Sequence, residues 1–241
     1  MNYPTTKQAL ITGASSGIGK ATALAFAKAG INLALVSRES ENLTAVAAAA
    51  RAVGVKAEAY PLDLSKIEEV QSGISAIAAQ FGPIDILVNS AGMGYTGPLT
   101  ETPLADWQRV LDLNLTSVWQ CIEGILPGMR DRKSGIIINV SSIAGSQVFL
   151  NWGLYCVSKF GLMALSKAVA TEERARGIRV TAICPGSVNT PMWDTETVQA
   201  DFDRTAMLTP EIVAESILHA VQLPASAVIE EITLMSNAGV L

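Results

Sequence analysis

The sequence predicts an α/β protein with a single doubly wound domain, built on a seven-stranded, mainly parallel sheet with helices on both faces. Three observations lead to this prediction. Apolar, β-branched runs alternate with helical stretches from one end of the chain to the other, which is the pattern of repeated βαβ units. Runs such as 84–88 and 135–140 are apolar at nearly every position, as expected for strands buried on both faces. Of the 241 residues, 49% are hydrophobic, so the chain can bury a large core.

The alternation gives each element an approximate range. The predicted strands are 7–12, 31–37, 55–60, 84–89, 135–140, 178–184 and 228–234. The predicted helices between them are 17–29, 40–53, 66–81, 104–130, 155–176 and 210–222. No linker, composition break or repeat separates these elements, so we expect one domain over residues 1–241.

The first strand runs into a glycine-rich turn that opens the first helix. Gly13, Gly17 and Gly19 allow the backbone to turn sharply and to approach a ligand closely. The helix that follows directs its free N–H groups and its dipole toward an anion such as a pyrophosphate. A tight turn without a ligand is the alternative interpretation. The spacing G-x-x-x-G-x-G also differs from the G-x-G-x-x-G of the general dinucleotide-binding fingerprint.

Candidate binding residues follow the other strands in the same way. In open α/β sheets, ligands bind outside the carboxyl ends of the strands. We therefore expect these residues to share one site with the glycine-rich turn. In chain order they are Ser37-Arg38, Asp63, Asn89, Ser142 and Pro185-Gly186.

Tyr155 and Lys159 lie four residues apart in a predicted helix, so their side chains share one helix face. A phenol with an ordinary pKa near 10 carries protons poorly at neutral pH. A positive charge at ~4 Å is worth roughly 4 kcal/mol at an effective dielectric near 20, enough to bring the tyrosine pKa close to neutrality. Taken alone, the pair occurs by chance on many helix surfaces, and a solvated helix surface is then the favoured interpretation.

Composition and charge exclude several classes of protein. The net charge of −5 gives no electrostatic basis for binding nucleic acid or an anionic membrane. The three cysteines are isolated, which fits a reducing cytosol, and neither a signal peptide nor an apolar run of about 18 residues is visible. Because His219 is the only histidine, neither a Ser–His–Asp triad nor a histidine-rich metal site is expected. We expect a cytoplasmic protein without a metal.

Together these motifs resemble those of the compact short-chain dehydrogenase/reductases. The resemblance runs from about Lys7 to the C-terminus and implies a Rossmann domain that binds a nicotinamide cofactor. Ser90, where this family more often has a second asparagine, and Cys184, before Pro185, depart from the pattern. The residues that carry the resemblance are Thr12-Gly13-x-x-x-Gly17-Ile18-Gly19, Asn89-Ser90-Ala91-Gly92, Asn114, Ser142, Tyr155-x-x-x-Lys159 and Pro185-Gly186.

The second strand indicates which cofactor is bound. NAD enzymes of this architecture carry an acidic residue near the end of that strand, where this chain has Ser37 followed by Arg38. A guanidinium pairs with a 2′-phosphate, so we expect NADP(H) in preference to NAD(H). Asp63, which the resemblance places at the cofactor, is equally compatible with the N-cap of the helix that follows. The resemblance implies cofactor contacts at Gly13, Ser15, Ser16, Gly17, Ile18, Gly19, Ser37, Arg38, Asp63, Leu64, Asn89, Ala91, Gly92, Tyr155, Lys159, Pro185, Gly186, Val188 and Thr190.

The resemblance also implies catalytic roles. Tyr155 would give a proton to the carbonyl oxygen, Lys159 would lower the phenol pKa and bind the ribose, and Ser142 would hold the substrate oxygen. Asn114 would help to hold a water in the proton relay, or would be a structural residue bonded to backbone. Neighbouring Ser141 is expected to face away, because successive side chains alternate along a strand end.

The substrate is only broadly defined by the sequence. We expect reduction of a carbonyl to a secondary alcohol, or the reverse, on a general carbonyl or 3-hydroxy-acid substrate in an apolar pocket. The alternatives are a 3-oxoacyl-carrier-protein reductase, a non-catalytic NADP-binding sensor and a sugar-nucleotide epimerase. A homotetramer or homodimer is expected, with contacts through the final strand and residues 238–241. The expected pocket residues are Met93, Tyr95, Val148, Phe149, Leu150, Trp152, Met192, Trp193 and Met207.

Overall fold

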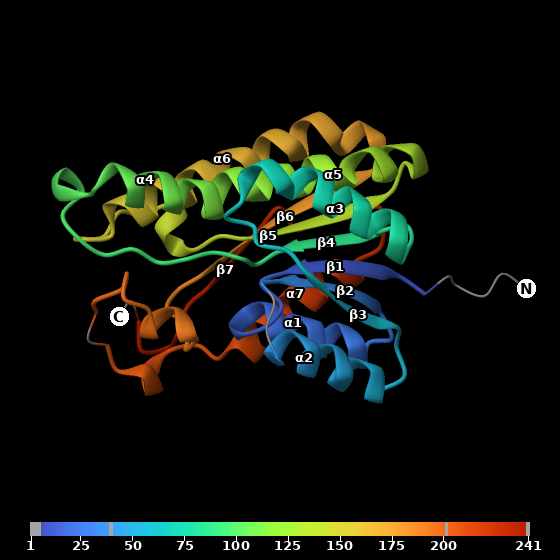
Figure 1. Cartoon of the computed structure of the whole chain (residues 1–241), viewed down its shortest axis with the longest axis horizontal. Coiled ribbons are helices and arrows are strands. Elements are labelled where there is room, and N and C mark those ends of the chain that lie inside the picture. Colours follow the sequence, from blue (N-terminus) through green and yellow to red (C-terminus); the bar gives the residue numbers. More distant parts are fainter. Residues whose placement is uncertain (1–5, 39–40, 201, 240–241) are drawn as a thin grey trace, which may run out of the picture.

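The fold is built on one sheet of seven strands in the order β3-β2-β1-β4-β5-β6-β7, and every neighbouring pair is parallel (Figure 1). The computed structural model describes residues 6–38, 41–200 and 202–239. The strands are β1 (Gln8–Thr12), β2 (Asn32–Ser37), β3 (Ala57–Pro61), β4 (Ile86–Asn89), β5 (Gly135–Val140), β6 (Ile178–Pro185) and β7 (Glu231–Leu234). This order, with helices on both faces, confirms the predicted doubly wound α/β fold.

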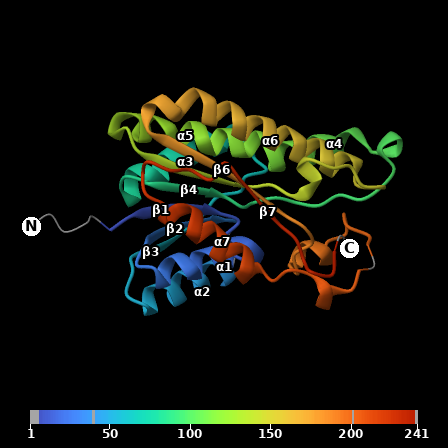
Figure 2. The same ribbon diagram turned by 180° about the vertical axis from the view of Figure 1, so that it is seen from behind.

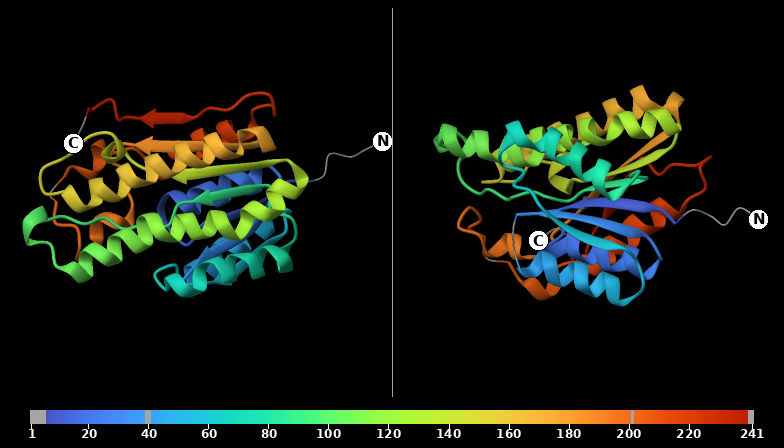
Figure 3. Two further views of the ribbon diagram at one scale, coloured as in Figure 1. Left: turned by 90° about the horizontal axis from the view of Figure 1, so that it is seen from above. Right: turned by 45° about the vertical axis from the view of Figure 1, so that its right-hand side comes forward.

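Helices cover both faces of the sheet, as Figures 1 and 2 show from opposite sides. One face is covered by α1 (Gly17–Lys28), α2 (Glu41–Ala52) and α7 (Pro210–Gln222). The other is covered by α3 (Ile67–Phe81), α5 (Ser117–Arg132) and α6 (Gly153–Glu173), with α4 (Leu104–Leu111) leading into α5. The short 3-10 turns are η1 (Leu99–Glu101), η3 (Ile143–Gly145), η4 (Arg174–Arg176), η5 (Pro191–Asp194) and η6 (Arg204–Ala206), and η2 (Asp112–Thr116) is a π-helical turn. Figure 3 shows α5 and α6 running side by side across the sheet.

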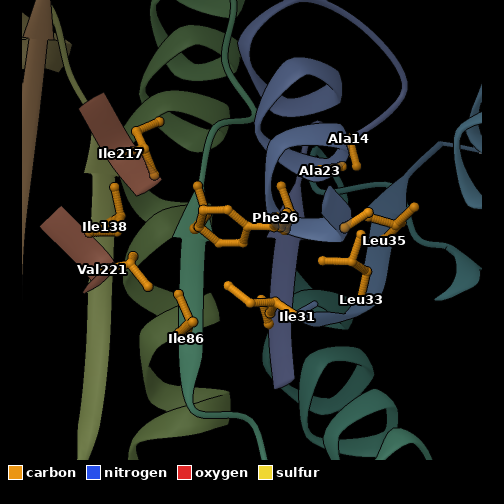
Figure 4. Close-up of a cluster of buried hydrophobic side chains, with 14 of the residues drawn as sticks. Ala14, Ala23, Phe26, Ile31, Leu33, Leu35, Ile86, Ile138, Ile217 and Val221 are labelled. Carbon is orange, nitrogen blue, oxygen red and sulfur yellow. The ribbon is translucent and has the colours of Figure 1, made fainter. Parts of the chain in front are cut away.

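Each face of the sheet has its own apolar core because successive strand residues point to opposite faces. On one face, Phe26 of α1 is fully buried and lies near Ile86 and Ile31 (Figure 4). On the other, Leu87 of β4 and Ile137 of β5 belong to the core formed with α3, α5 and α6. A fully buried side chain of this size contributes about 1.5–3 kcal/mol, so both layers hold the strand ends in place.

The largest difference from the sequence-based ranges lies in the predicted helix 104–130. This helix is interrupted by the π-helical turn η2, and α5 then continues to Arg132. The turn carries Asn114, whose side chain points inward to the backbone of Met93. A π turn accommodates an extra residue within a helix and occurs frequently at functional sites.

The other predicted ranges agree to within about three residues. The strands predicted at 55–60, 84–89 and 228–234 begin at Ala57, Ile86 and Glu231. The helix predicted at 155–176 begins at Gly153 and ends in the single turn η4. The predicted helix start at 40, and residues 240–241 of the expected C-terminal contact, lie outside the described residues. Across the described ranges, no helix is both long and apolar enough to cross a membrane.

Candidate active site

A cleft of about 1200 Å³ runs along the carboxyl ends of the strands. It extends from Arg38, at the end of β2, to Trp193 and Phe202 in the segment after β6. The loops that follow β1, β4 and β5 form its floor, and Figure 1 shows this end of the sheet on the left. The structure therefore brings most of the predicted binding residues into one cavity, at the place expected for a doubly wound sheet.

The glycine-rich turn has no room for side chains. Gly13 has φ +66°, and a Cβ there would lie 2.8 Å from the backbone nitrogen of Ala91. Gly17 has φ +50°, and a Cβ there would lie 3.1 Å from Cγ2 of Thr190 across the cleft. The turn leads into the N-terminus of α1, whose free N–H groups favour an anion. These positions fit a phosphate group lying directly against the backbone.

Serine and arginine side chains surround the end of β2. The hydroxyl oxygens of Ser15 and Ser37 lie 2.9 Å apart, and Arg38 is exposed beside them. Burial alone would raise the pKa of the Asp63 carboxyl, but hydrogen bonds from Ser65 and the charge of Arg38 hold it below its ordinary value. Asp63 accepts these bonds from the Ser65 N–H (3.0 Å) and hydroxyl (2.8 Å), and α3 begins further on, so Asp63 is not the N-cap of α3. The Ser15 and Ser37 hydroxyls and the Arg38 guanidinium are donors that fit a phosphate at this corner of the cleft.

Asn114 uses its side chain to hold the loop after β4. Its Nδ2 donates to the carbonyl oxygen of Met93 (2.9 Å) and to Oγ of Ser158 (3.0 Å), and its Oδ1 accepts from the Met93 N–H (2.8 Å). Asn114 is buried behind the cleft wall and not among its lining residues. A Cβ on Gly92 would lie 3.3 Å from Asn114 Oδ1 and 3.8 Å from Lys159 Nζ, so the amide lies close to the lysine. The structural role is therefore observed, while the water relay stays a prediction.

Ser142, Tyr155 and Lys159 meet at the centre of the cleft. The Ser142 hydroxyl donates to the carbonyl oxygen of Pro185 (3.4 Å), and its Oγ accepts from the N–H of Ala144 (3.1 Å), so that Ser142 is the N-cap of η3. The neighbouring Ser141 makes no such hydrogen bonds with its side chain to any described residue. Its Oγ is buried next to Gly145, where an added Cβ would lie 2.9 Å away.

Burial shifts the pKa values of Tyr155 and Lys159. Burial raises the pKa of Tyr155 to about 12, although the Ser142 hydrogen bond opposes the rise. Burial also lowers the pKa of Lys159 to about 8. The Lys159 ammonium donates to the carbonyl oxygen of Val140 (3.0 Å) and lies 5.7 Å from the centroid of the Tyr155 ring. The pKa of Tyr155 is thus raised in this arrangement, because desolvation of the phenol is the largest contribution, and the lowering of that pKa by Lys159 stays a prediction.

Two predicted cofactor residues lie behind the cleft wall instead of in it. A Cβ on Gly19 would lie 2.3 Å from the Gly13 carbonyl oxygen, so this glycine is required by the packing of the turn. Asn89 is buried, and its Nδ2 donates to Oδ1 of Asn139 (2.9 Å). Nδ2 of Asn139 in turn donates to Oγ of Ser166 in α6 (2.9 Å). The predicted cofactor residues that do line the cleft are Gly13, Ser15, Ser16, Gly17, Ile18, Ser37, Arg38, Asp63, Leu64, Ala91, Gly92, Tyr155, Lys159, Pro185, Gly186, Val188 and Thr190.

Thr12 fixes the loop after β4, a role that the sequence analysis missed. Its Oγ1 accepts from the N–H groups of Ser90 (3.1 Å) and Ala91 (3.2 Å). Asn139 was missed as well, although a lone polar residue in the apolar run 135–140 was a usable signal. Both residues connect strands through buried hydrogen bonds, which apolar side chains cannot provide.

The far end of the cleft is largely aromatic and apolar. Of the nine residues expected in the substrate pocket, six line the cleft: Met93, Phe149, Leu150, Trp152, Met192 and Trp193. Tyr95, Val148 and Met207 are not among its lining residues, whereas Phe202, Asp106 and Arg109, which the sequence analysis missed, are. His219 lies on α7 outside the cleft, and no group of residues suited to hold a metal occurs in the described ranges.

Comparisons with known proteins agree with this geometry. The family model for short chain dehydrogenases matches residues 7–201. A 3-oxoacyl-[acyl-carrier-protein] reductase of Synechocystis sp. is 38% identical, covering 99% of this chain and 98% of its own length. Glycine betaine reductase ATRR of Emericella nidulans is 34% identical over 95% of this chain, but this chain spans only 18% of that protein.

Solved structures show the same fold. An alcohol dehydrogenase from the archaeon Thermococcus sibiricus, complexed with 5-hydroxy-NADP, has a TM-score of 0.88 at 29% identity and covers 96% of this chain and 97% of its own. A variant of actinorhodin polyketide ketoreductase with NADPH has a TM-score of 0.87 at 30% identity, covering 99% of both chains. With the family model matching most of the sequence, the chain belongs to the short-chain dehydrogenase family and is an oxidoreductase of that family.

Proposed function

We propose that this protein is an NADP(H)-dependent oxidoreductase that reduces a carbonyl to a secondary alcohol, or catalyses the reverse reaction. The observation that carries the proposal is the meeting of Ser142, Tyr155 and Lys159 at the centre of a cleft that continues to the glycine-rich turn. A non-catalytic NADP-binding sensor would need the turn but not these three side chains. We also propose that the chain forms one domain, acts in the cytoplasm and assembles as a homodimer or homotetramer.

The residues around β2 support NADP(H) in preference to NAD(H). Ser37 stands where a carboxylate would repel a 2′-phosphate, and the exposed Arg38 can pair with that phosphate. The related alcohol dehydrogenase and ketoreductase structures contain 5-hydroxy-NADP and NADPH, which supports the same choice. Gly13 and Gly17 would hold the pyrophosphate against the backbone, and Thr190 would cover it from the opposite side.

Arg38→Asp tests the choice of cofactor. The charge reversal should raise the KM for NADPH at least tenfold and shift the preference toward NADH, because a carboxylate at this position repels the 2′-phosphate. Lys28→Asp, the same reversal at the exposed end of α1, is the control and should change neither KM. An unchanged KM for NADPH in Arg38→Asp would remove Arg38 from the phosphate site.

The side chains of the cleft provide proton transfer and orientation. When bound, the nicotinamide supplies the hydride that reduces the carbonyl carbon. The Tyr155 hydroxyl holds a proton up to high pH, since its pKa is about 12, and can donate this proton to the carbonyl oxygen. Ser142, which lines the same cleft as Tyr155, can hydrogen-bond the same oxygen and fix its position. Lys159 places a positive charge beside the pair, and Asn114 keeps the neighbouring loop in place.

Tyr155→Phe tests the proton donor. Removing only the hydroxyl should lower kcat by roughly 10²- to 10⁴-fold, the usual contribution of a general acid. NADPH affinity should persist, because the ring contact with Trp152 does not need the hydroxyl. Tyr60→Phe is the matched control, since it deletes a hydroxyl that bonds Glu58 on β3, away from the cleft. An active Tyr155→Phe enzyme would refute the proposed role of Tyr155.

The substrate we propose is a general carbonyl or 3-hydroxy-acid compound. A 3-oxoacyl-carrier-protein substrate is the second candidate, favoured by the 38% identity to the reductase of Synechocystis sp.. Initial rates of NADPH oxidation with ketones, aldehydes, 3-oxoesters and 3-oxoacyl thioesters distinguish the two. Tight NADPH binding without turnover on any of these compounds would favour the sensor instead.

A further inference from the structure

Five aromatic residues line the cleft, and four of them form a continuous series of ring contacts that starts at the proposed proton donor, Tyr155. The Tyr155 and Trp152 centroids lie 5.4 Å apart with planes at 70°, and those of Trp152 and Trp193 lie 5.7 Å apart at 67°. Phe202 continues the series at 5.4 Å and 87° from Trp193. Each contact is edge to face, the arrangement that aromatic rings prefer. Trp152 and Tyr155 come from the start of α6, where Trp152 is the N-cap, and Trp193 and Phe202 come from η5 and the segment after it; we call these four rings the aromatic wall.

The central ring of the aromatic wall is held in place. Trp193 Nε1 donates to the carbonyl oxygen of Val188 (2.8 Å), which fixes the plane of its indole. Arg204 braces the same segment, because its guanidinium donates to the Thr190 carbonyl oxygen (3.0 Å) and to Asp194 (2.8 Å). A ring held by its own hydrogen bond and by its neighbours presents a preformed binding surface, so a ligand pays little ordering entropy there.

Charges at this end of the cleft do not favour an anion. Among the described residues that line it here, the carboxylates of Asp106, Asp194 and Glu196 accompany the single cation Arg109. The Asp194 carboxylate is already paired with Arg204. A carboxylate or phosphate on the part of the substrate at this outer end, away from Lys159, would therefore meet more carboxylates than cations.

We propose that the substrate is an uncharged ketone, or the corresponding secondary alcohol, that carries an aromatic ring packed against the aromatic wall. This inference rests on the proposed function and narrows it, because it selects the general carbonyl compound over the 3-hydroxy acid, whose carboxylate is charged at neutral pH. With the carbonyl oxygen at Ser142 and Tyr155, the rest of the substrate extends along Trp152 toward Trp193 and Phe202. A ring there adds one more edge-to-face contact to the series, and a saturated ring of the same size cannot make that contact.

Phenylacetone and cyclohexylacetone test the proposal as a matched pair. In both ketones a methylene separates the ring from the carbonyl, so the intrinsic reactivity of the carbonyl is similar. The aromatic compound should have a kcat/KM higher by roughly 3- to 10-fold, the usual advantage of an aromatic pair over apolar burial alone. Trp193→Leu should abolish this preference, so that the kcat/KM values for phenylacetone and cyclohexylacetone become equal. Trp119→Leu, a half-exposed tryptophan on α5 outside the cleft, is the control and should keep the preference.

The outcomes separate this inference from the proposed function. Equal kcat/KM values for the two ketones, in an enzyme that reduces both, would overturn the aromatic substrate and leave the reductase intact. Failure to reduce any ketone, with NADPH bound, would overturn the proposed function and this inference with it. If Trp193→Leu does not fold, Phe202→Leu provides the same test from the outer end of the wall. A faster reduction of acetoacetate than of its ethyl ester would contradict the uncharged substrate.

Discussion

Replacing Lys159 by methionine should make the stability of the protein less dependent on pH. Burial lowers the pKa of Lys159 from its ordinary 10.5 to about 8, and the side chain is only 5% exposed. Because one pKa unit corresponds to about 1.36 kcal/mol, burying the ammonium opposes folding by about 3 kcal/mol at neutral pH. Lys159→Met removes this penalty, although it also removes the hydrogen bond to the Val140 carbonyl oxygen.

The sign of the pH dependence follows from the order of the two pKa values. Below pH 8 the lysine is charged in both the folded and the unfolded chain, so the penalty is complete. Between pH 8 and 10.5 the folded protein releases the proton first, and the stability contributed by this group rises with pH. Above 10.5 both states are neutral and the penalty is gone. The free energy of unfolding of Lys159→Met, relative to the wild type, should therefore fall by about 2.5 kcal/mol from pH 7 to pH 10.

Urea unfolding of both proteins at pH 7, 8, 9 and 10 measures this difference. Lys167→Met is the control, because Lys167 lies on the same helix with an exposed side chain and corrects for the loss of one positive charge. The raised pKa of Tyr155 acts above pH 10 and is common to all three proteins. The opposite result is that the free energies of unfolding of Lys159→Met and the wild type differ by an amount that is constant within about 0.5 kcal/mol across this range. That result would refute the conclusion that burial opposes the charged form of Lys159.

Two further substitutions test the cleft. In urea titrations, Gly13→Ala should lower the free energy of unfolding by more than Gly30→Ala does. Both glycines have a positive φ, which costs about 1–2 kcal/mol for alanine. Only at Gly13 would the new Cβ also meet backbone, at 2.8 Å. Equal losses would show that the loop beside Gly13 can move aside. Arg204→Ala should raise the KM for NADPH several-fold with little change in the melting temperature, because the guanidinium donates to the Thr190 carbonyl at the cleft rim. An unchanged KM would show that this hydrogen bond does not contribute to cofactor binding.

Much of the fold was predictable because hydrophobic patterning decides it. The apolar runs at 84–88 and 135–140 could only be strands buried on both faces, and their alternation with helices implied parallel pairing. The break in the helix predicted at 104–130 was not visible in this pattern. Asn114 stood out only through the resemblance, and hydropathy could not show its partner Met93, which lies 21 residues away.

The candidate site also has features that the sequence predicted and features that it did not. Local sequence was enough to identify which groups could act: the glycine-rich turn, Arg38 and the set of Ser142, Tyr155 and Lys159. These groups stand at or after strand ends, where a parallel sheet brings them together.

The pKa values of these groups, and the aromatic side chains next to them, depend on tertiary packing. Burial, which depends on every neighbouring element, raises the pKa of Tyr155 and lowers that of Lys159. The aromatic wall joins Trp152 to Trp193 and Phe202 across a stretch of chain with no local pattern. Contacts between residues distant in sequence arise from packing of the whole chain, so local spacing could not reveal them.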